Sequence, residues 1–135
     1  MKPFLLPELG KSYDHERVFS RADILEFARI TGDHGDHHTD PNRRVMAQGL
    51  LVASIVTKLG GDMNYVARSM DFEMLKPVYE GEKIRGEVKV TSLVRKPNRL
   101  KLAMVCTCFN SAGEAVIAGQ SRGLIWLEST AVAPV

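Results

Sequence analysis

The stretch MAQGLLVASIVTKLGG, residues 46–61, decides how the rest of the chain must be arranged. Its apolar side chains fall on nearly every side of a helix instead of along one stripe, and a helix that is apolar all round is a buried one. These side chains are Ala47, Leu50, Leu51, Val52, Ala53, Ile55, Val56 and Leu59. The pair Gly60-Gly61 is expected to end the helix, so the stretch predicts one short helix that other elements wrap on most sides.

A second helix is expected earlier in the chain. Ser20 and Asp23 have the spacing of a capping box, in which Ser20 caps the helix and Asp23 occupies its third position. Ile24 and Ala28 then fall on one helical face, together with Phe27. Gly32, four residues after Ala28, is expected to end the helix because many helices end with a glycine in the left-handed region.

The rest of the chain reads as strands joined by turns. The segment SYDHERVFS, residues 12–20, alternates enough to form a first strand, and β-forming runs follow at residues 64–75, 83–95, 100–110 and 115–127. Lys76-Pro77, Glu80-Gly81, KPNR at 96–99 and SAGE at 111–114 are the turn signals between them. The prediction is an α+β fold in a single domain, residues 1–135 with a core at about 13–127, in which a curved antiparallel β-sheet wraps around a central buried helix.

The composition narrows the class of protein. With 44% hydrophobic and 25% charged residues the chain resembles a globular protein, and its net charge of +2 is too small to indicate binding to nucleic acid or to a membrane. The N-terminus lacks the apolar core of a signal peptide. Cys106 and Cys108 share one face of a strand, a geometry that does not suit a disulfide. We therefore expect a cytoplasmic protein with reduced thiols.

The stretch TGDHGDHHTD, residues 31–40, gathers histidines and aspartates between the two expected helices. Zinc accepts such ligands, but the neighbours His37 and His38 tend to diverge and no HExxH or cysteine pattern accompanies them, so no metal site is predicted. A solvated turn is one interpretation of the stretch. The other is an acid–base site, because a histidine titrates near neutral pH and can exchange protons with a nearby water.

The residues around this cluster resemble those of the MaoC-like, (R)-specific enoyl-CoA hydratases of the hotdog superfamily. FARITGDHGDHHTDP, residues 27–41, follows the family pattern F-A-x-x-[ST]-G-D-x-N-P-x-H-x-D, and residues 46–61 follow H-G-M-L-x-A-S. MDFEMLKPVYEGEKI, residues 70–84, resembles the family segment F-x-x-P-V-x-x-G-D. The resemblance implies a hotdog fold and the reversible addition of water to a trans-2-enoyl thioester of coenzyme A, giving an (R)-3-hydroxyacyl thioester.

The resemblance also implies which residues act. Asp33 and His38 match the catalytic pair, and Gly49 matches the glycine whose backbone N–H holds the thioester carbonyl. At the start of a buried helix that N–H is one of the unpaired donors, and the helix dipole adds positive potential there. A glycine also lets the thioester approach the backbone closely.

The loop that carries the pair departs from the family pattern. Gly35 and Asp36 stand where the family has asparagine and proline, and Gln48 stands where it has histidine. Gly35, Gln48 and Thr57 are expected to support the active-site loop. The departures concern the placement of the catalytic pair and leave the pair itself intact.

Binding partners follow from the same resemblance. The substrate would be an acyl-CoA, with no cofactor besides that thioester, and two sets of cations are candidates for its phosphates: Arg43 with Arg44, and Arg95 with Lys96 and Arg99. For each set a solvated turn is the alternative. A homodimer or higher homo-oligomer is expected, and the run 100–109 could pair with its own copy.

Two other functions remain open from the sequence. A hotdog acyl-CoA thioesterase would need a carboxylate placed to act at the carbonyl carbon, which Asp33 or Asp36 could supply. A non-catalytic acyl-CoA-binding protein is favoured by the changes at Gly35 and Gln48. The sequence does not determine the acyl chain length or the physiological direction of the reaction.

Overall fold

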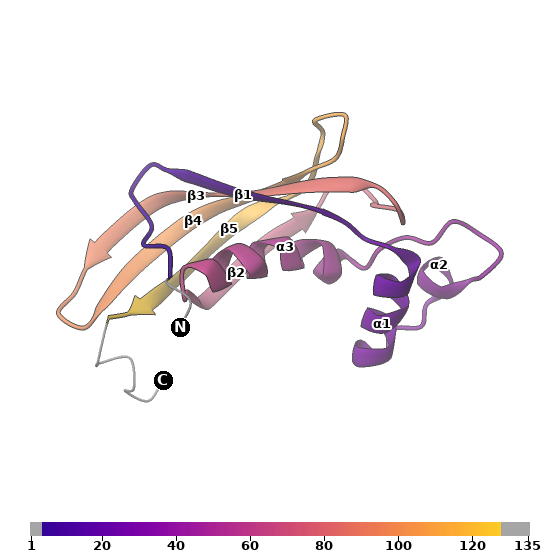
Figure 1. Cartoon of the computed structure of the whole chain (residues 1–135), viewed down its shortest axis with the longest axis horizontal. Coiled ribbons are helices and arrows are strands. Elements are labelled where there is room, and N and C mark those ends of the chain that lie inside the picture. The colour runs from indigo at the N-terminus through magenta and orange to yellow at the C-terminus, as the bar shows by residue number, and fades with distance from the viewer. Residues whose placement is uncertain (1–3, 128–135) are drawn as a thin grey trace.

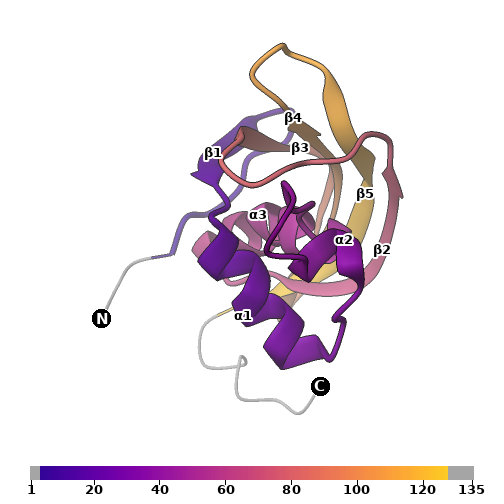
Figure 2. The same ribbon diagram turned by 90° about the vertical axis from the view of Figure 1, so that its right-hand side faces the viewer.

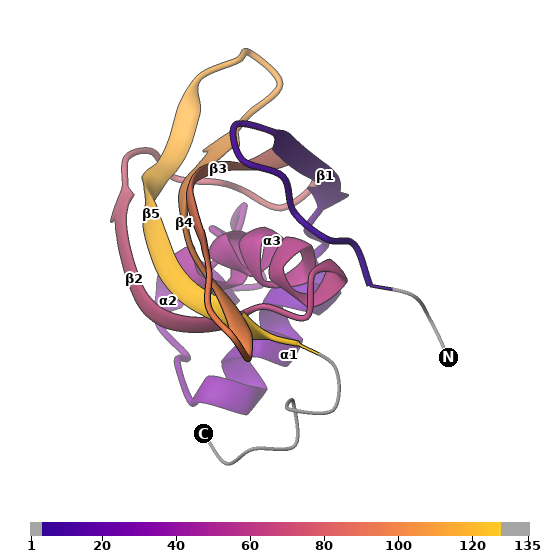
Figure 3. The same cartoon turned by 90° about the vertical axis from the view of Figure 1, so that its left-hand side faces the viewer.

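A five-stranded antiparallel sheet curls around one helix, α3 (Gly49–Asp62), as Figures 1 and 3 show. The computed structural model describes residues 4–127. The other helices are α1 (Arg21–Thr31) and α2 (Asp36–Thr39), and both lie at one end of the sheet (Figures 1 and 2). The strands are β1 (Ser12–Val18), β2 (Val66–Met74), β3 (Lys83–Arg95), β4 (Arg99–Phe109) and β5 (Ala115–Trp126), in the sheet order β1-β3-β4-β5-β2.

Helix α3 is buried on most of its circumference, as the sequence predicts. Val52, Ile55 and Val56 are almost fully buried, and Leu51, Ala53 and Leu59 are also buried. Leu50 is the exception, because 67% of its surface is exposed. Leu50, which the sequence counts among the buried apolar side chains of the helix, instead faces the open side between α3 and the edge strand β2.

Helix α1 begins and ends where the sequence predicts. The Ser20 hydroxyl accepts a hydrogen bond from the N–H of Asp23, and the Asp23 carboxylate accepts one from the N–H of Ser20. Ile24 and Ala28 face the core. At the other end Gly32 adopts a φ of 81°, and its N–H donates to the carbonyl of Ala28.

The three long strands β3, β4 and β5 form the predicted antiparallel meander. Cys106 and Cys108 point into the core from the same face of β4, as free thiols. Burial raises the pKa of Cys106 to about 12 and that of Cys108 to about 11. Both thiols are therefore uncharged packing groups.

Strand β4 lies in the middle of the sheet, bonded to β3 on one side and to β5 on the other. The prediction that residues 100–109 could pair with their own copy is therefore wrong, because both hydrogen-bonding edges of β4 are used within the chain. The free edges belong to β1 and β2. Strand order depends on contacts between distant segments, which β-propensity along the chain does not reveal.

The glycines of β5 let the edge strand β2 approach closely. A Cβ atom on Gly119 would collide with the carbonyl oxygen of Asp71, and one on Gly123 with that of Val66. The pairing of β2 with β5 also shifts register between Ala67 and Ser69. Close approach and a bulge both increase the curvature that brings β2 around α3. Within residues 4–127 no helix combines the length and the apolar character needed to cross a membrane.

Candidate active site

A tight loop between α1 and α2 brings two residues that are five positions apart into contact. After Gly32 the carboxylate of Asp33 accepts a hydrogen bond from the N–H of Gly35, at 3.2 Å. Gly35 precedes α2, and its carbonyl accepts the N–H of His38 at 2.9 Å. A Cβ atom on Gly35 would lie only 2.8 Å from Cε1 of His37. A side chain at Gly35 would therefore require the exposed His37 ring to move.

The imidazole of His38 lies between a carbonyl and a carboxylate. Its Nδ1 is 2.6 Å from the carbonyl oxygen of Met46, and its Nε2 is 3.4 Å from Oδ2 of Asp33. A carbonyl only accepts hydrogen bonds, so Nδ1 must carry the hydrogen and Nε2 of the neutral ring carries a lone pair. Nε2 and Asp33 are then both acceptors, which a proton shared between them or one donor beside the two atoms can satisfy.

Burial differs between the two partners. His38 is 6% exposed, whereas half of the Asp33 side chain reaches solvent. The ring of His37 lies 3.9 Å from that of His38, tilted by 47°. Within residues 4–127 no group of three or more histidine, cysteine or acidic side chains is positioned to hold a metal ion.

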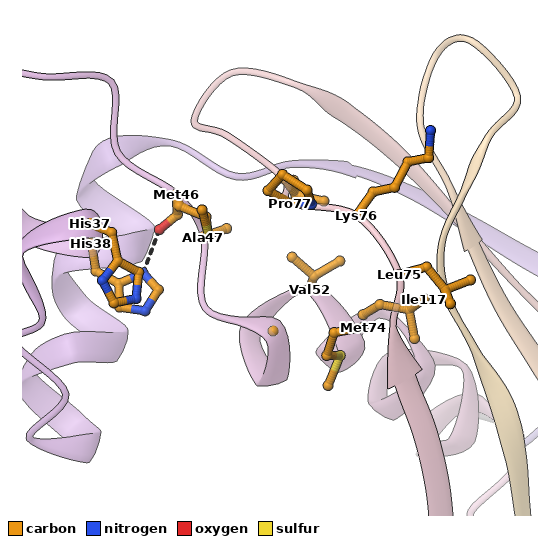
Figure 4. A pocket seen from close by; sticks show the side chains of 12 residues that line it. His37, His38, Met46, Ala47, Val52, Met74, Leu75, Lys76, Pro77 and Ile117 are labelled. Carbon is orange, nitrogen blue, oxygen red and sulfur yellow. Dashed lines mark hydrogen bonds between the residues drawn. The ribbon is translucent and has the colours of Figure 1, made fainter.

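A pocket of about 450 Å³ opens beside His38. Figure 4 shows the two histidine rings at one side of it and Met74, Leu75 and Ile117 across from them. Its wall is mainly apolar, and Gly49 at the start of α3 also lines it. The volume is in the range of sites for small organic ligands. Asp33 reaches this pocket through its contact with His38 and is not itself among the described lining residues.

Gly49 is the first residue of α3, and its N–H has no hydrogen-bond partner among residues 4–127. The positive end of the helix dipole therefore faces the same pocket as His38. A Cβ atom on Gly49 would lie 3.2 Å from three atoms of Met74. The glycine keeps a narrow space open between the helix start and Met74.

Gln48 and Thr57 lie in different surroundings, although both were expected to support the active-site loop. Gln48 is 3% exposed, and its Nε2 donates to the carbonyl of Ile24 at 3.0 Å, which ties the start of α3 to α1. Thr57 lies eight residues beyond Gly49, about 12 Å along the helix. It is exposed and lines a separate hollow with Leu50. The structure therefore does not bring Thr57 to the active-site loop.

The two candidate sets of cations lie far apart. Arg44 stands on the segment between α2 and α3, where it is 3.5 Å from Glu82 and stacks over the ring of Tyr79 at 4.5 Å. Arg43 is beside it and exposed. Arg95, Lys96 and Arg99 lie at the β3–β4 hairpin, at the opposite end of the sheet from α1 and α2 (Figure 1). The fold separates these sets within one chain.

An ion pair that the sequence analysis missed holds the segment leading to Met46. Arg21 donates to the Glu80 carboxylate from Nε at 3.0 Å and from Nη2 at 2.7 Å, and Nη2 also reaches the carbonyl of Arg43 at 2.6 Å. The same carboxylate accepts the N–H of Val45 at 3.0 Å. The hydrogen bonds from Arg21, and then that from Val45, hold the pKa of Glu80 below its usual range. This clamp fixes the backbone next to the carbonyl that orients His38.

Comparisons with known proteins agree with this architecture. The chain is 28% identical over 123 residues to the mitochondrial 3-hydroxyacyl-[acyl-carrier-protein] dehydratase of Arabidopsis thaliana, covering 83% of this chain and 73% of that protein. It is 24% identical over 127 residues to the (R)-specific enoyl-CoA hydratase of Aeromonas caviae, covering 84% and 92%. No protein-family model matches the chain.

The solved structure of the (R)-hydratase from Aeromonas caviae superposes with a TM-score of 0.79 at 22% identity, covering 88% of this chain and 96% of that one. A second (R)-hydratase, from Pseudomonas aeruginosa, gives a TM-score of 0.76 at 20% identity, covering 96% and 92%. These likenesses confirm the α+β hotdog fold that the sequence predicts.

Proposed function

We propose that this chain, which resembles (R)-specific enoyl-CoA hydratases and MaoC-like dehydratases in sequence and in fold, catalyses the same class of reaction. It adds water reversibly to a trans-2-enoyl thioester of coenzyme A and forms an (R)-3-hydroxyacyl thioester. The observation that supports this most is the contact of Nε2 of His38 with Oδ2 of Asp33 beside an apolar pocket. The reaction as proposed needs no cofactor other than the thioester substrate.

The first step uses the lone pair on Nε2. A water that donates one hydrogen to Nε2 of His38 and the other to the Asp33 carboxylate satisfies both acceptors. Nε2 takes the proton as the water oxygen bonds to the β-carbon, and the π-electrons of the double bond move toward the thioester carbonyl. The imidazolium then returns its proton to the α-carbon, so that one water is added in all.

The negative charge that develops on the carbonyl oxygen needs a donor. The free N–H of Gly49 and the N-terminus of α3 supply one in the same pocket. Removal of one such donor costs about 3–4 kcal/mol of transition-state stabilisation in other enzymes. The apolar wall holds the acyl chain, and Arg43 and Arg44 are the closer candidates for the coenzyme A phosphates.

We also propose that two copies associate through the open side of α3 and strand β2. Leu50, Met70 and Met74 are 67%, 51% and 50% exposed there, and the outer edge of β2 is free of a neighbour within the described chain. A long unprotected edge and exposed apolar side chains favour pairing. Antiparallel pairing of β2 with its copy would bury both features. A cytoplasmic location stays a prediction.

Incubation with crotonyl-CoA tests the reaction. Loss of the enoyl absorbance without release of free thiol is the expected result. Thiol release would indicate a thioesterase, the second enzymatic candidate. If neither change occurs with enoyl thioesters of several chain lengths, the chain is not a hydratase, and direct binding of these thioesters would then favour the non-catalytic alternative.

A further inference from the structure

The outer face of the sheet, the face turned away from α3, carries a basic groove near the β3–β4 hairpin. The groove encloses about 560 Å³ and contains no acidic side chain among its lining residues. Its cations come from strands β2, β4 and β5 and from the β3–β4 turn. They are Arg68, Lys96, Arg99, Lys101 and Arg122.

The cations of the groove are left without anionic partners. None of them forms an ion pair with a residue of the described range 4–127, whereas Lys58, Lys83 and Arg85 elsewhere pair with nearby carboxylates. From residue 88 to residue 127 the sequence has one acidic residue, Glu114, and Lys76 is bound to it. The positive potential in the groove is therefore not neutralised by the described chain.

Strand pairing explains how the cations meet. Lys101 on β4 lies opposite Leu124 on β5, and Arg122 on β5 lies opposite Ser69 on β2. Arg122 also lies opposite Ala103, two residues along β4 from Lys101, so Lys101 and Arg122 are diagonal neighbours on one face of strands about 4.8 Å apart. Leu124, which shares the outer face with Lys101, is buried and contributes an apolar floor. The groove thus combines a cationic rim with an apolar base.

The groove is separate from the pocket beside His38. The two share no lining residue, and the hairpin lies at the opposite end of the sheet from α1 and α2 (Figure 1). A second copy of the chain is a poor occupant, because two such grooves would repel each other. The expected occupant is an anion with an apolar portion.

We propose that this groove binds a phosphorylated small molecule of nucleotide size. Arginine presents a planar fork that matches phosphate oxygens, and three of the cations are arginines. The floor at Leu124 accepts the apolar face of a base, and the volume suits a ligand of this size. The proposal does not depend on the hydratase function.

Calorimetric titration with ADP tests it, with adenosine and inorganic pyrophosphate as the other arms. We expect ADP to bind with a Kd below about 1 mM, more tightly than either part alone and more weakly as salt is added. Lys101→Gln and Arg122→Gln should each weaken binding about threefold to tenfold, because each removes one solvent-screened charge contact. Thermal unfolding of each variant verifies that it is folded.

Lys89→Gln is the matched control. Lys89 is also an exposed, unpaired lysine of the described chain on the outer face, opposite Val105 on β4, but it does not line the groove. ADP affinity within about twofold of the unsubstituted protein is expected, since charges beyond about 8 Å are screened at physiological salt.

No binding of ADP, an equal loss of ADP affinity in the Lys89→Gln control, or equal affinity for pyrophosphate and ADP would overturn the proposal. Displacement of ADP by lower concentrations of an acidic peptide would overturn it in favour of a protein partner. Because binding is measured directly, a failure here is distinct from failure of the hydration assay.

Discussion

Nε2 of His38 lies 3.4 Å from Oδ2 of Asp33, and the opposite nitrogen of the same ring is held by a backbone carbonyl at 2.6 Å. The carbonyl fixes where the ring hydrogen resides, so the nitrogen that faces Asp33 is the basic one. A buried histidine and a half-exposed carboxylate are thereby aimed at the same point beside the pocket.

Gly49→Ala should separate stability from activity. Alanine at a helical position is more favourable than glycine by up to about 1 kcal/mol, whereas its Cβ would lie 3.2 Å from Met74 and narrow the space before the N–H. We expect unchanged or higher thermal stability and a kcat/KM for crotonyl-CoA about 10- to 100-fold lower. Gly61→Ala is the control, because nothing lies within 4 Å of a Cβ there. Full activity of Gly49→Ala would contradict the oxyanion role.

Glu80→Gln should weaken the clamp that holds the segment before Met46. The pKa of Glu80 is lowered in the folded chain, chiefly by Arg21, so the ion pair stabilises the protein above the ordinary value of 4.5 and that contribution is lost as pH falls through the lowered value. The free energy of unfolding should therefore be lower in Glu80→Gln than in the unsubstituted protein at neutral pH, and this difference should become smaller at low pH. A difference that does not shrink would rule out the ion pair as its source.

The same variant should also lower kcat, since the carbonyl that orients His38 is next to the clamp. Glu26→Gln breaks the exposed pair of Glu26 with Arg29 and is the matched control. It should leave kcat unchanged. Equal kcat values in the two variants would show that the clamp has no positioning role.

Both cysteines should resist alkylation in the folded protein. Burial raises the pKa of Cys106 to about 12 and that of Cys108 to about 11, so at pH 8 at most about one thiol in a thousand is the reactive thiolate. Mass spectrometry after iodoacetamide treatment should find no label in native protein and two labels in denaturant. Rapid native labelling would contradict the closed core beneath β4.

Met70→Glu should disrupt self-association if β2 and the open side of α3 form the interface. A buried charge at such a surface costs at least about 2 kcal/mol, which raises the dimer Kd about 30-fold. Light scattering should then shift from a dimer toward the 15.0 kDa monomer. Val105→Glu alters an exposed apolar residue on the outer face and should leave the mass unchanged. A monomeric unsubstituted protein would refute the dimer.

The features of the fold that the sequence predicted correctly are those that short stretches of the chain determine. The caps at Ser20 and Gly32 and the apolar run of α3 involve neighbours along the chain, so their signals are complete within short windows. The exposure of Leu50 and the central place of β4 depend on strand order instead. No short-range pattern contains that information.

The residues of the candidate site also divide into those that a short stretch of sequence reveals and those that it does not. Asp33 and His38 could be found because one short motif carries both. Arg21 and Glu80 are 59 residues apart and meet only in the folded chain, so nothing in either local sequence indicated the pair. Thr57 was selected because the resemblance implies a serine or threonine there that supports the active-site loop, whereas its distance along α3 takes it away from the loop.

The rate of the double variant Asp33→Asn, His38→Gln on crotonyl-CoA tests the central claim most directly, because two groups that act on one water are not independent. Each single substitution should lower kcat by about 10²- to 10⁴-fold. The kcat of the double variant should lie within about threefold of that of the slower single variant. Multiplied losses in the double variant, or a full rate in either single variant, would contradict a shared water between Asp33 and His38.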